Sequence, residues 1–363
     1  MKILLLGATG LLGNNVLETL LLGGHDVTVI VRNPDAVVGV SVPDDAQQRL
    51  RASSGLPEVS FSSGGSEVRI IKGLLTDARI MRHAARGCNA LVNCAGDTDM
   101  SHRRQEDYYP VNRDLCTTIL EVAQTEKIET IVHVSTVNTI GHGSEALLSD
   151  ENVAMQPPFT DSWYALSKLA GERILLNGNF ENRRSANLSQ VKPRVVIVNP
   201  GYIIGKYDQK PSSGKLLIAG WRKRLMIVPP GGKSFVGAHT VAMAIEAALT
   251  KGRNGEKYIV TDEDMTFCQF FQSAAQAGGY KQHIIVLPRF VCRLAGVIGD
   301  ALAWIGIGVS FTSRNVRQLM VFEHYSNQKM VEELAIEPSP IYEAIKDFLK
   351  YKQLYRQHIR KSL

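Results

Sequence analysis

Three glycines close to the N-terminus constrain this chain more than any other feature of its sequence. Gly7, Gly10 and Gly13 separate a short apolar run, Lys2–Leu6, from a stretch with helical apolar spacing, Leu11–Leu22. Glycine lets a chain turn sharply between a strand and a helix, and it lets the backbone come close to a bound group. The start of the helix then offers free N–H groups and a positive dipole end to phosphates. The GxxGxxG spacing therefore predicts a strand–turn–helix unit that binds the pyrophosphate of a dinucleotide.

Strands and helices are expected to alternate up to Gly205. Further strands are expected at Val27–Val31, Val68–Ile71, Ala90–Asn93, Thr130–Val134 and Arg194–Val198, and further helices at Ser162–Leu176 and Thr240–Leu249. Continuous apolar strands separated by helices indicate a parallel sheet that is covered on both faces. The predicted fold class is α/β, a Rossmann-type doubly wound parallel sheet with a smaller C-terminal substrate lobe. Residues 1–205 would form the dinucleotide-binding domain, with return elements near 234–262, and residues 206–363 mostly the substrate lobe and C-terminal helices.

The residue after the second strand bears on the choice of cofactor. Folds of this kind that bind NAD usually place an acid there, which bonds the ribose 2′-hydroxyl. This chain instead has Arg32 directly after Val31. A guanidinium can pair with a 2′-phosphate through two hydrogen bonds. We therefore expect NADP(H) rather than NAD, while an ordinary surface role for Arg32 stays open.

A tyrosine and a lysine one helical turn apart are candidates for proton transfer. Tyr164 and Lys168 would share one face of a helix, where an ammonium lowers the pKa of a phenol from about 10 towards neutrality. The Tyr-x-x-x-Lys pattern is weak by itself, because it occurs at four places, Tyr164/Lys168, Tyr202/Lys206, Tyr325/Lys329 and Tyr342/Lys346. Only the first pair lies between the fifth and sixth expected strands. Ser135 and Thr136 follow the fifth strand, so either hydroxyl could hold a substrate oxygen while Tyr164 protonates it.

With these motifs in place, the chain resembles the extended short-chain dehydrogenase/reductase superfamily, within the NAD-dependent epimerase/dehydratase family. It is most similar to dihydroflavonol-reductase-like and 3β-hydroxysteroid-dehydrogenase-like members. Besides the glycine turn and the Tyr164/Lys168 pair, the resemblance rests on Asn93–Gly96, the hydroxyl pair, Asn199–Gly201, Pro229–Gly232 and Tyr325–Lys329. It covers nearly the whole chain.

The resemblance implies roles for individual residues. Tyr164, Lys168 and Thr136 would be catalytic, with Ser135 as the second choice for the hydroxyl. Pro200 would abut the nicotinamide, and Ala95 and Gly96 would line the ribose and phosphate region. The expected cofactor-binding residues are Gly7, Thr9, Gly10, Leu11, Leu12, Gly13, Arg32, Leu75, Ala95, Gly96, Tyr164, Lys168 and Pro200.

Three departures from the family pattern fall near this site. The Asp-Leu pair usual after the third strand is Leu74-Leu75 here, and the usual arginine before the Pro-Gly pair is Asn199. Residues 40–67 read as an inserted loop with one short helix near Asp44–Arg51. The pyrophosphate end of the predicted site is therefore better supported than its adenine end.

Three functions are compatible with these motifs. The first is an NADP(H)-dependent oxidoreductase that interconverts a carbonyl and an alcohol on a small hydrophobic substrate. The second is a nucleotide-sugar epimerase that uses the same residues, with Arg222–Arg224 either clamping a diphosphate or forming a basic surface loop. Sugar dehydratases of the superfamily carry Asp-Glu directly after the catalytic threonine, for acid–base elimination. Here Val137-Asn138 follow Thr136, so dehydration is disfavoured. The third is a non-enzymatic dinucleotide-binding regulator or assembly factor, which usually lacks the Tyr or the Lys.

Composition limits partners and location. The net charge of +6 suits anionic ligands but is too dispersed for nucleic acid. The five cysteines form no CxxC pair, so we expect reduced core residues and no metal site. The N-terminus enters a strand at once and shows no cleavable leader, which favours a cytoplasmic enzyme. A small-molecule substrate is expected, and the family resemblance allows a homodimer.

One apolar stretch stands apart from the dinucleotide-binding motifs. Phe290–Phe311 is long enough to span a bilayer, but Arg293 and Asp300 interrupt it. A charged residue at the bilayer centre costs about 2.5–3.5 kcal/mol on insertion scales. We therefore expect a buried or substrate-covering helix pair there, with a membrane-associated segment as the less favoured alternative.

Overall fold

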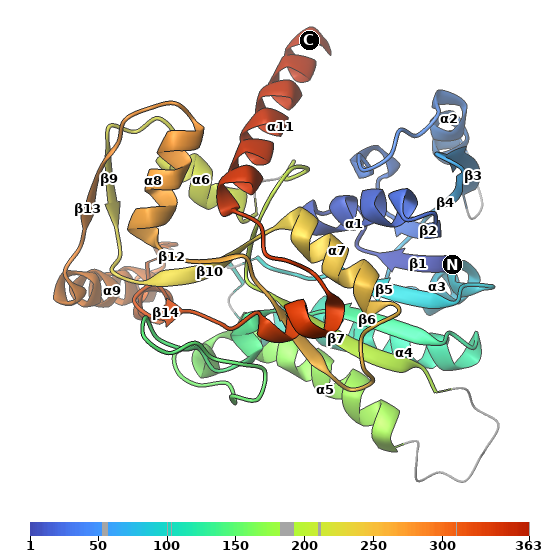
Figure 1. The fold of residues 1–363 in the computed structure, drawn as a ribbon, viewed down its shortest axis with the longest axis horizontal. Helices are drawn as coiled ribbons and strands as arrows, with labels where there is room; N and C mark the ends of the chain where they lie inside the picture. Colours follow the sequence, from blue (N-terminus) through green and yellow to red (C-terminus); the bar gives the residue numbers. More distant parts are fainter. Residues whose placement is uncertain are drawn as a thin grey trace.

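The computed structural model describes residues 1–52, 57–99, 101–102, 104–181, 192–209, 212–309 and 311–362. Its centre is an eight-stranded sheet with the order β11-β7-β6-β5-β1-β2-β4-β3 (Figure 1). The strands are β1 (Lys2–Leu6), β2 (Asp26–Val31), β3 (Glu58–Ser63), β4 (Ser66–Lys72), β5 (Ala90–Asn93), β6 (Thr130–Val134), β7 (Arg194–Pro200) and β11 (Lys257–Val260). All neighbouring strands are parallel except β3 and β4.

Both faces of this sheet are buried, because its strands are apolar at successive positions. Along β1, Ile3 and Leu5 join one core while Leu4 and Leu6 join the other. The first core also contains residues of α1 (Leu11–Leu22) and α7 (Ala238–Ala248). The second contains residues of α3 (Ala78–Ala85), α4 (Leu115–Thr125) and α5 (Trp163–Glu181). This is the doubly wound arrangement that the alternating sequence predicts.

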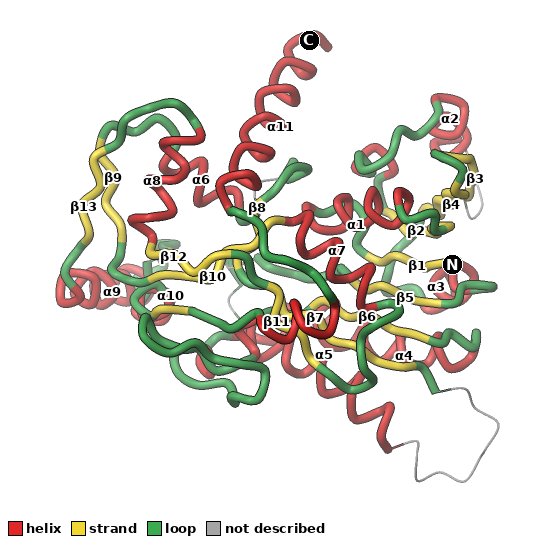
Figure 2. Tube along the Cα trace, in the orientation of Figure 1, coloured by secondary structure: helices red, strands yellow, loops and turns green. Residues whose placement is uncertain are grey.

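A second lobe lies to one side of the sheet (Figure 2). Its strands are β8 (Tyr202–Ile204), β9 (Leu225–Val228), β10 (Gly232–Gly237), β12 (Glu263–Thr266), β13 (His283–Val286) and β14 (Phe322–Glu323). Its helices are α6 (Gly214–Gly220), α8 (Phe267–Ala277), α9 (Arg289–Trp304), α10 (Ser313–Gln318) and α11 (Ile341–Ser362). Phe235 and Phe270 stack at its centre with ring centroids 4.2 Å apart. β11 returns from this part of the sequence to the edge of the main sheet, beside β7.

The inserted segment contains more structure than its composition predicts. Its short helix is present as α2 (Asp44–Ala52), but it also holds a strand, β3, which the loop prediction misses. β3 pairs with β4 across the Gly64-Gly65 turn and becomes the edge of the main sheet. The reason is cross-strand pairing: Val59 is buried next to β4, although the serines around it have little strand character by themselves.

The expected burial of Phe290–Phe311 is wrong for its large side chains. Most of the stretch forms α9, and the partner helix, α10, comes after it rather than within it. Phe290 is 71% exposed and Trp304 is 89% exposed, whereas the glycines of the helix are buried. Small residues fit against the rest of the chain, which leaves the bulky ones outside. Among the described helices, none is long and apolar enough to cross a membrane.

Candidate active site

The glycine turn connects β1 to α1 and lies against the end of β5. Gly7 has a φ of +81°, and a Cβ on it would come within 2.6 Å of the backbone nitrogen of Ala95. A Cβ on Gly13 would lie 2.0 Å from the carbonyl oxygen of Gly7. Both positions therefore exclude any larger residue. Gly10 caps α1 without a side-chain hydrogen bond, so the first N–H groups of the helix are not covered by a capping side chain. The turn fits a pyrophosphate group.

Thr9, Leu11 and Leu12 belong to the same turn and to the first residues of α1. Ala95 and Gly96 follow β5 across from it, and Asn93 holds this segment by accepting a hydrogen bond from the Ala95 N–H at 3.0 Å. The structure thus brings the predicted pyrophosphate and ribose residues from β1, α1 and β5 to the carboxyl edge of the sheet, where ligands bind in open α/β folds.

Arg32 lies at the same edge, directly after β2, and is exposed. Val31 and Lys72 are register partners in β2 and β4, so a second cationic residue ends the neighbouring strand. Leu74 is 55% exposed, whereas Leu75 packs against the second core. The adenine end of the predicted site thus has two basic residues, Arg32 and Lys72. It also has the exposed Leu74 at the position where the family pattern places an aspartate.

Lys168 lies deep in the fold. It is only 3% exposed, and its Nζ donates a hydrogen bond of 2.7 Å to the carbonyl oxygen of Val134, at the end of β6. A Cβ on Gly96 would lie 3.8 Å from this Nζ. Burial lowers the pKa of Lys168. The ammonium is therefore held between β6 and the segment that follows β5.

Tyr164 lies one turn earlier on α5, with its phenol near the Thr136 hydroxyl. Burial raises the pKa of Tyr164 to about 12, and the nearby Thr136 hydroxyl opposes this in part. The lowered phenol pKa that the lysine spacing predicts is therefore not found here. The physical reason is that the Lys168 ammonium is bound to Val134 while the low-dielectric surroundings of the phenol penalise the phenolate.

Ser135, the second candidate hydroxyl, occupies a different position from Thr136. Its backbone N–H donates to the carbonyl oxygen of Val198, and its Oγ is buried without a hydrogen-bond partner among the described residues. Thr136 caps the short helical turn Val137–Thr139, with its Oγ accepting from the Asn138 N–H. Thr136 rather than Ser135 is the hydroxyl that lies near the Tyr164 phenol.

The other three Tyr-x-x-x-Lys pairs are engaged elsewhere. Lys206 forms an ion pair with Glu18, and Lys329 forms one with Glu256. Lys346 contacts Glu343 on the exposed side of α11. Position in the fold thus separates the first pair from the other three.

A buried polar network behind Thr136 was not predicted from the sequence. The Asn199 Nδ2 donates to the carbonyl oxygen of Thr136 at 3.0 Å and to Glu172 Oε1 at 3.0 Å. Glu172 is fully buried, and its other oxygen accepts from Lys257 Nζ at 2.5 Å. Thr139 also donates to Glu172, at 2.6 Å. The sequence marks Asn199 as the departure before Pro200, and Glu172 lies one turn beyond Lys168, but no local pattern indicates that these residues meet.

Asn112 is a second residue that the sequence reasoning missed. Its Nδ2 donates to Ser167 Oγ and to the carbonyl oxygen of Asp97, both at 2.9 Å, while its Oδ1 accepts from the Asp97 N–H. Tyr108, which lies between Asp97 and Asn112 in the sequence, has its ring centroid 6.2 Å from that of Tyr164. Asn112 therefore ties the segment after Gly96 to α5 beside the candidate catalytic tyrosine.

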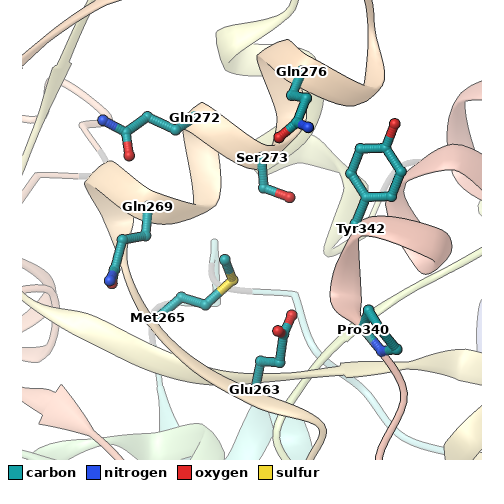
Figure 3. A pocket seen from close by; sticks show the side chains of 8 residues that line it. All are labelled: Glu263, Met265, Gln269, Gln272, Ser273, Gln276, Pro340 and Tyr342. Carbon is teal, nitrogen blue, oxygen red and sulfur yellow. The ribbon is translucent and has the colours of Figure 1, made fainter.

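A pocket in the second lobe contains none of the predicted site residues. It lies between β12, α8 and the start of α11, and side chains such as Glu263, Ser273, Gln276 and Tyr342 line it (Figure 3). It is separate from the carboxyl edge of the main sheet, and we assign no ligand to it.

The fold and this edge of the sheet define a class of protein, a Rossmann-type dinucleotide-binding α/β protein with a hydroxyl, a tyrosine and a lysine grouped beside the glycine turn. The model of the NAD dependent epimerase/dehydratase family matches residues 3–261, more than half of the chain. The chain belongs to this family. Its relatives include reductases and dehydrogenases.

Two curated relatives and one solved structure are similar over most of their length. Sterol demethylase protein B of Methylococcus capsulatus is 25% identical over 83% of this chain and 82% of its own. A putative dihydroflavonol 4-reductase of Synechocystis is 24% identical over 96% and 93%. The crystal structure of gox2253 superposes with a TM-score of 0.74 at 23% identity, over 98% of both chains. This structural likeness shows the shared fold.

Proposed function

We propose that this chain is an NADP(H)-dependent oxidoreductase that interconverts a carbonyl and an alcohol on a small hydrophobic substrate. The observation that carries the proposal is that the Tyr164 phenol and the Thr136 hydroxyl lie close together, one helical turn from buried Lys168. Thr136 orients the substrate oxygen, and Tyr164 gives that oxygen its proton or takes it back. Lys168 holds the ribose, while in the structure its ammonium is bound to the Val134 carbonyl and does not lower the pKa of Tyr164. The nicotinamide cofactor, when bound, supplies or accepts the hydride.

The hydrophobic class of the substrate is supported by the relatives. Two of them are named for sterol and dihydroflavonol chemistry. The test is a turnover assay with purified protein, deuterium-labelled NADPH and a panel of sterol-like and flavonoid-like ketones. We expect one deuterium to appear on the carbinol carbon of the product, detected by mass spectrometry. Loss of reduced cofactor without label in any product would refute the hydride transfer.

A nucleotide-sugar epimerase is the alternative, because the family includes epimerases by name. The same assay separates the two functions. An epimerase would convert a UDP-sugar without net change in external NADPH, whereas the proposed reductase consumes it. Arg222–Arg224, the candidate diphosphate clamp, are exposed and precede β9 in the second lobe. We favour the reductase because two curated relatives are named as a reductase and a ketoreductase.

Arg32→Ala tests the cofactor preference. We expect NADPH affinity to fall by about tenfold to a hundredfold, the value of charge-assisted hydrogen bonds to a phosphate, while NADH affinity stays unchanged. Quenching of tryptophan fluorescence during titration measures both constants. Arg79→Ala is a matched control, since Arg79 is an exposed arginine on α3. Equal binding of NADPH and NADH by the parent, unchanged in Arg32→Ala, would contradict the NADP(H) assignment.

A further inference from the structure

Helix α9 presents its bulky apolar side chains to solvent. Phe290, Leu294, Val297 and Trp304 are 71%, 60%, 61% and 89% exposed. Their spacing of three, four and seven residues places them along one stripe of the helix. Ile298 extends the stripe, and Ile305, Ile307 and Phe311 continue it beyond the helix. We call these side chains the α9 apolar face.

The opposite side of α9 explains why this face is outside. Cys292, Gly296 and Gly299 are its buried residues. A Cβ on Gly296 would lie 2.9 Å from Ser313 Cα, and one on Gly299 would lie 2.2 Å from the carbonyl oxygen of Phe311. The helix thus docks on its own chain through glycines in close backbone contact. This packing leaves the large apolar residues without a partner among the described residues, which is unusual for a contiguous patch on a monomer.

The surroundings of the α9 apolar face are basic. The parallel pair β9–β13 leads directly into α9, and all three elements lie at the end of the molecule farthest from the main sheet (Figure 1). Arg289 and Arg293 are exposed cations of α9 itself, and Arg222, Lys223, Arg224 and Lys281 are exposed at the far ends of β9 and β13, where these strands begin. Over residues 222–228, 281–309 and 311–318, Asp300 is the only acid, and its Oδ1 accepts the Ser313 N–H.

We propose that the α9 apolar face and its basic surroundings bind the surface of an anionic lipid bilayer. An amphipathic helix with Trp, Phe and Leu on one side and arginines beside them lies in the headgroup region with its apolar residues below. Basic side chains add attraction to anionic lipids. With 16 residues, α9 lies on the membrane rather than across it. A second copy of this chain fits less well, because a symmetric contact would bring these cations together.

This surface adjoins the candidate active site without overlapping it. Arg314 of α10 lies 4.1 Å above the ring of Trp163, the residue before Tyr164. Arg317 contacts Asp161 at 3.6 Å. None of the candidate catalytic or cofactor-binding residues belongs to the α9 apolar face. Lipid binding can therefore be measured independently of turnover. Its outcome does not depend on whether the proposed reaction is correct.

The test is flotation of the full chain with vesicles of phosphatidylcholine alone and of phosphatidylcholine mixed with phosphatidylglycerol. We expect binding to the anionic vesicles that weakens as salt is raised. The double variant Phe290→Ser/Trp304→Ser should lose at least about tenfold in affinity, because it removes two aromatic groups from the interface. The double variant Arg289→Gln/Arg293→Gln should lose roughly thirtyfold on anionic vesicles.

Leu22→Ser is the matched control, since Leu22 is 81% exposed at the end of α1, in the other domain. It should bind like the parent, and circular dichroism should be the same for all variants because every changed side chain is exposed. The proposal is overturned if the parent ignores anionic vesicles or if Phe290→Ser/Trp304→Ser binds them equally well. A solution dimer that this double variant dissociates would assign the face to a second copy instead.

Discussion

Tyr164→Phe is expected to lower kcat by about two to four orders of magnitude, the usual contribution of a positioned proton donor. The substitution removes only the phenolic oxygen, which lies near the Thr136 hydroxyl and which we propose protonates the substrate. Lys168 keeps its hydrogen bond to Val134, so NADPH affinity should stay within about twofold of the parent. Single-turnover measurements on the substrate found in the ketone panel, together with cofactor titration, give both quantities.

Tyr342→Phe is the control for this experiment. Tyr342 also precedes a lysine by four positions, but it lies at the start of α11 beside the pocket in the second lobe (Figure 3). The same atom is removed outside the candidate active site, and we expect full activity. If Tyr164→Phe kept parental kcat, another group would have to supply the proton and the assignment of Tyr164 would be wrong.

Lys257→Met is expected to destabilise the fold by about 3–5 kcal/mol, the cost of leaving a buried charge without its partner. Glu172 has 1% side-chain exposure, and Lys257 Nζ lies 2.5 Å from its Oε2. The Glu172 carboxylate would lose its cation in an interior that cannot solvate it. Urea unfolding followed by tryptophan fluorescence measures the difference in free energy of unfolding.

The double variant Lys257→Met/Glu172→Gln separates the charge from the shape of the network. We expect it to recover most of the lost stability, because no buried charge remains. Its activity should also return close to that of the parent, because glutamine keeps an oxygen in the place of Oε1, the one atom that accepts hydrogen bonds from Asn199 and Thr139. A Lys257→Met variant that lost under about 1 kcal/mol would show that the buried carboxylate does not depend on this cation.

The network around Glu172 could not be predicted from the sequence. Glu172 is a single carboxylate within a helix and Lys257 a lysine far along the chain, so nothing local signals that they meet. They do so because β11 returns to the main sheet beside β7. Asn112 is similar, since its three hydrogen bonds link Asp97 and Ser167, which lie on either side of it in the sequence.

The strands of the main sheet could be predicted because the sequence patterns that define them are local. The ends of β1, β5 and β6 coincide with the expected strands, since short apolar runs end where glycine or polar residues begin. The inserted strand β3 was missed for the converse reason. Its serines acquire strand structure only by pairing with β4.

The sequence by itself determined the glycine turn and the Tyr164–Lys168 spacing, because each depends on a few residues, and its alternating strands and helices predicted the doubly wound sheet. Thr136 comes from a separate segment after β6, and only the fold brings it near Tyr164. The tertiary structure alone decided which side chains are buried and what they contact. It left the phenol of Tyr164 with a pKa of about 12 by burying it, while Lys168 hydrogen bonds Val134. It also turned the apolar side of α9 outward, because glycine packs closely where phenylalanine and tryptophan cannot.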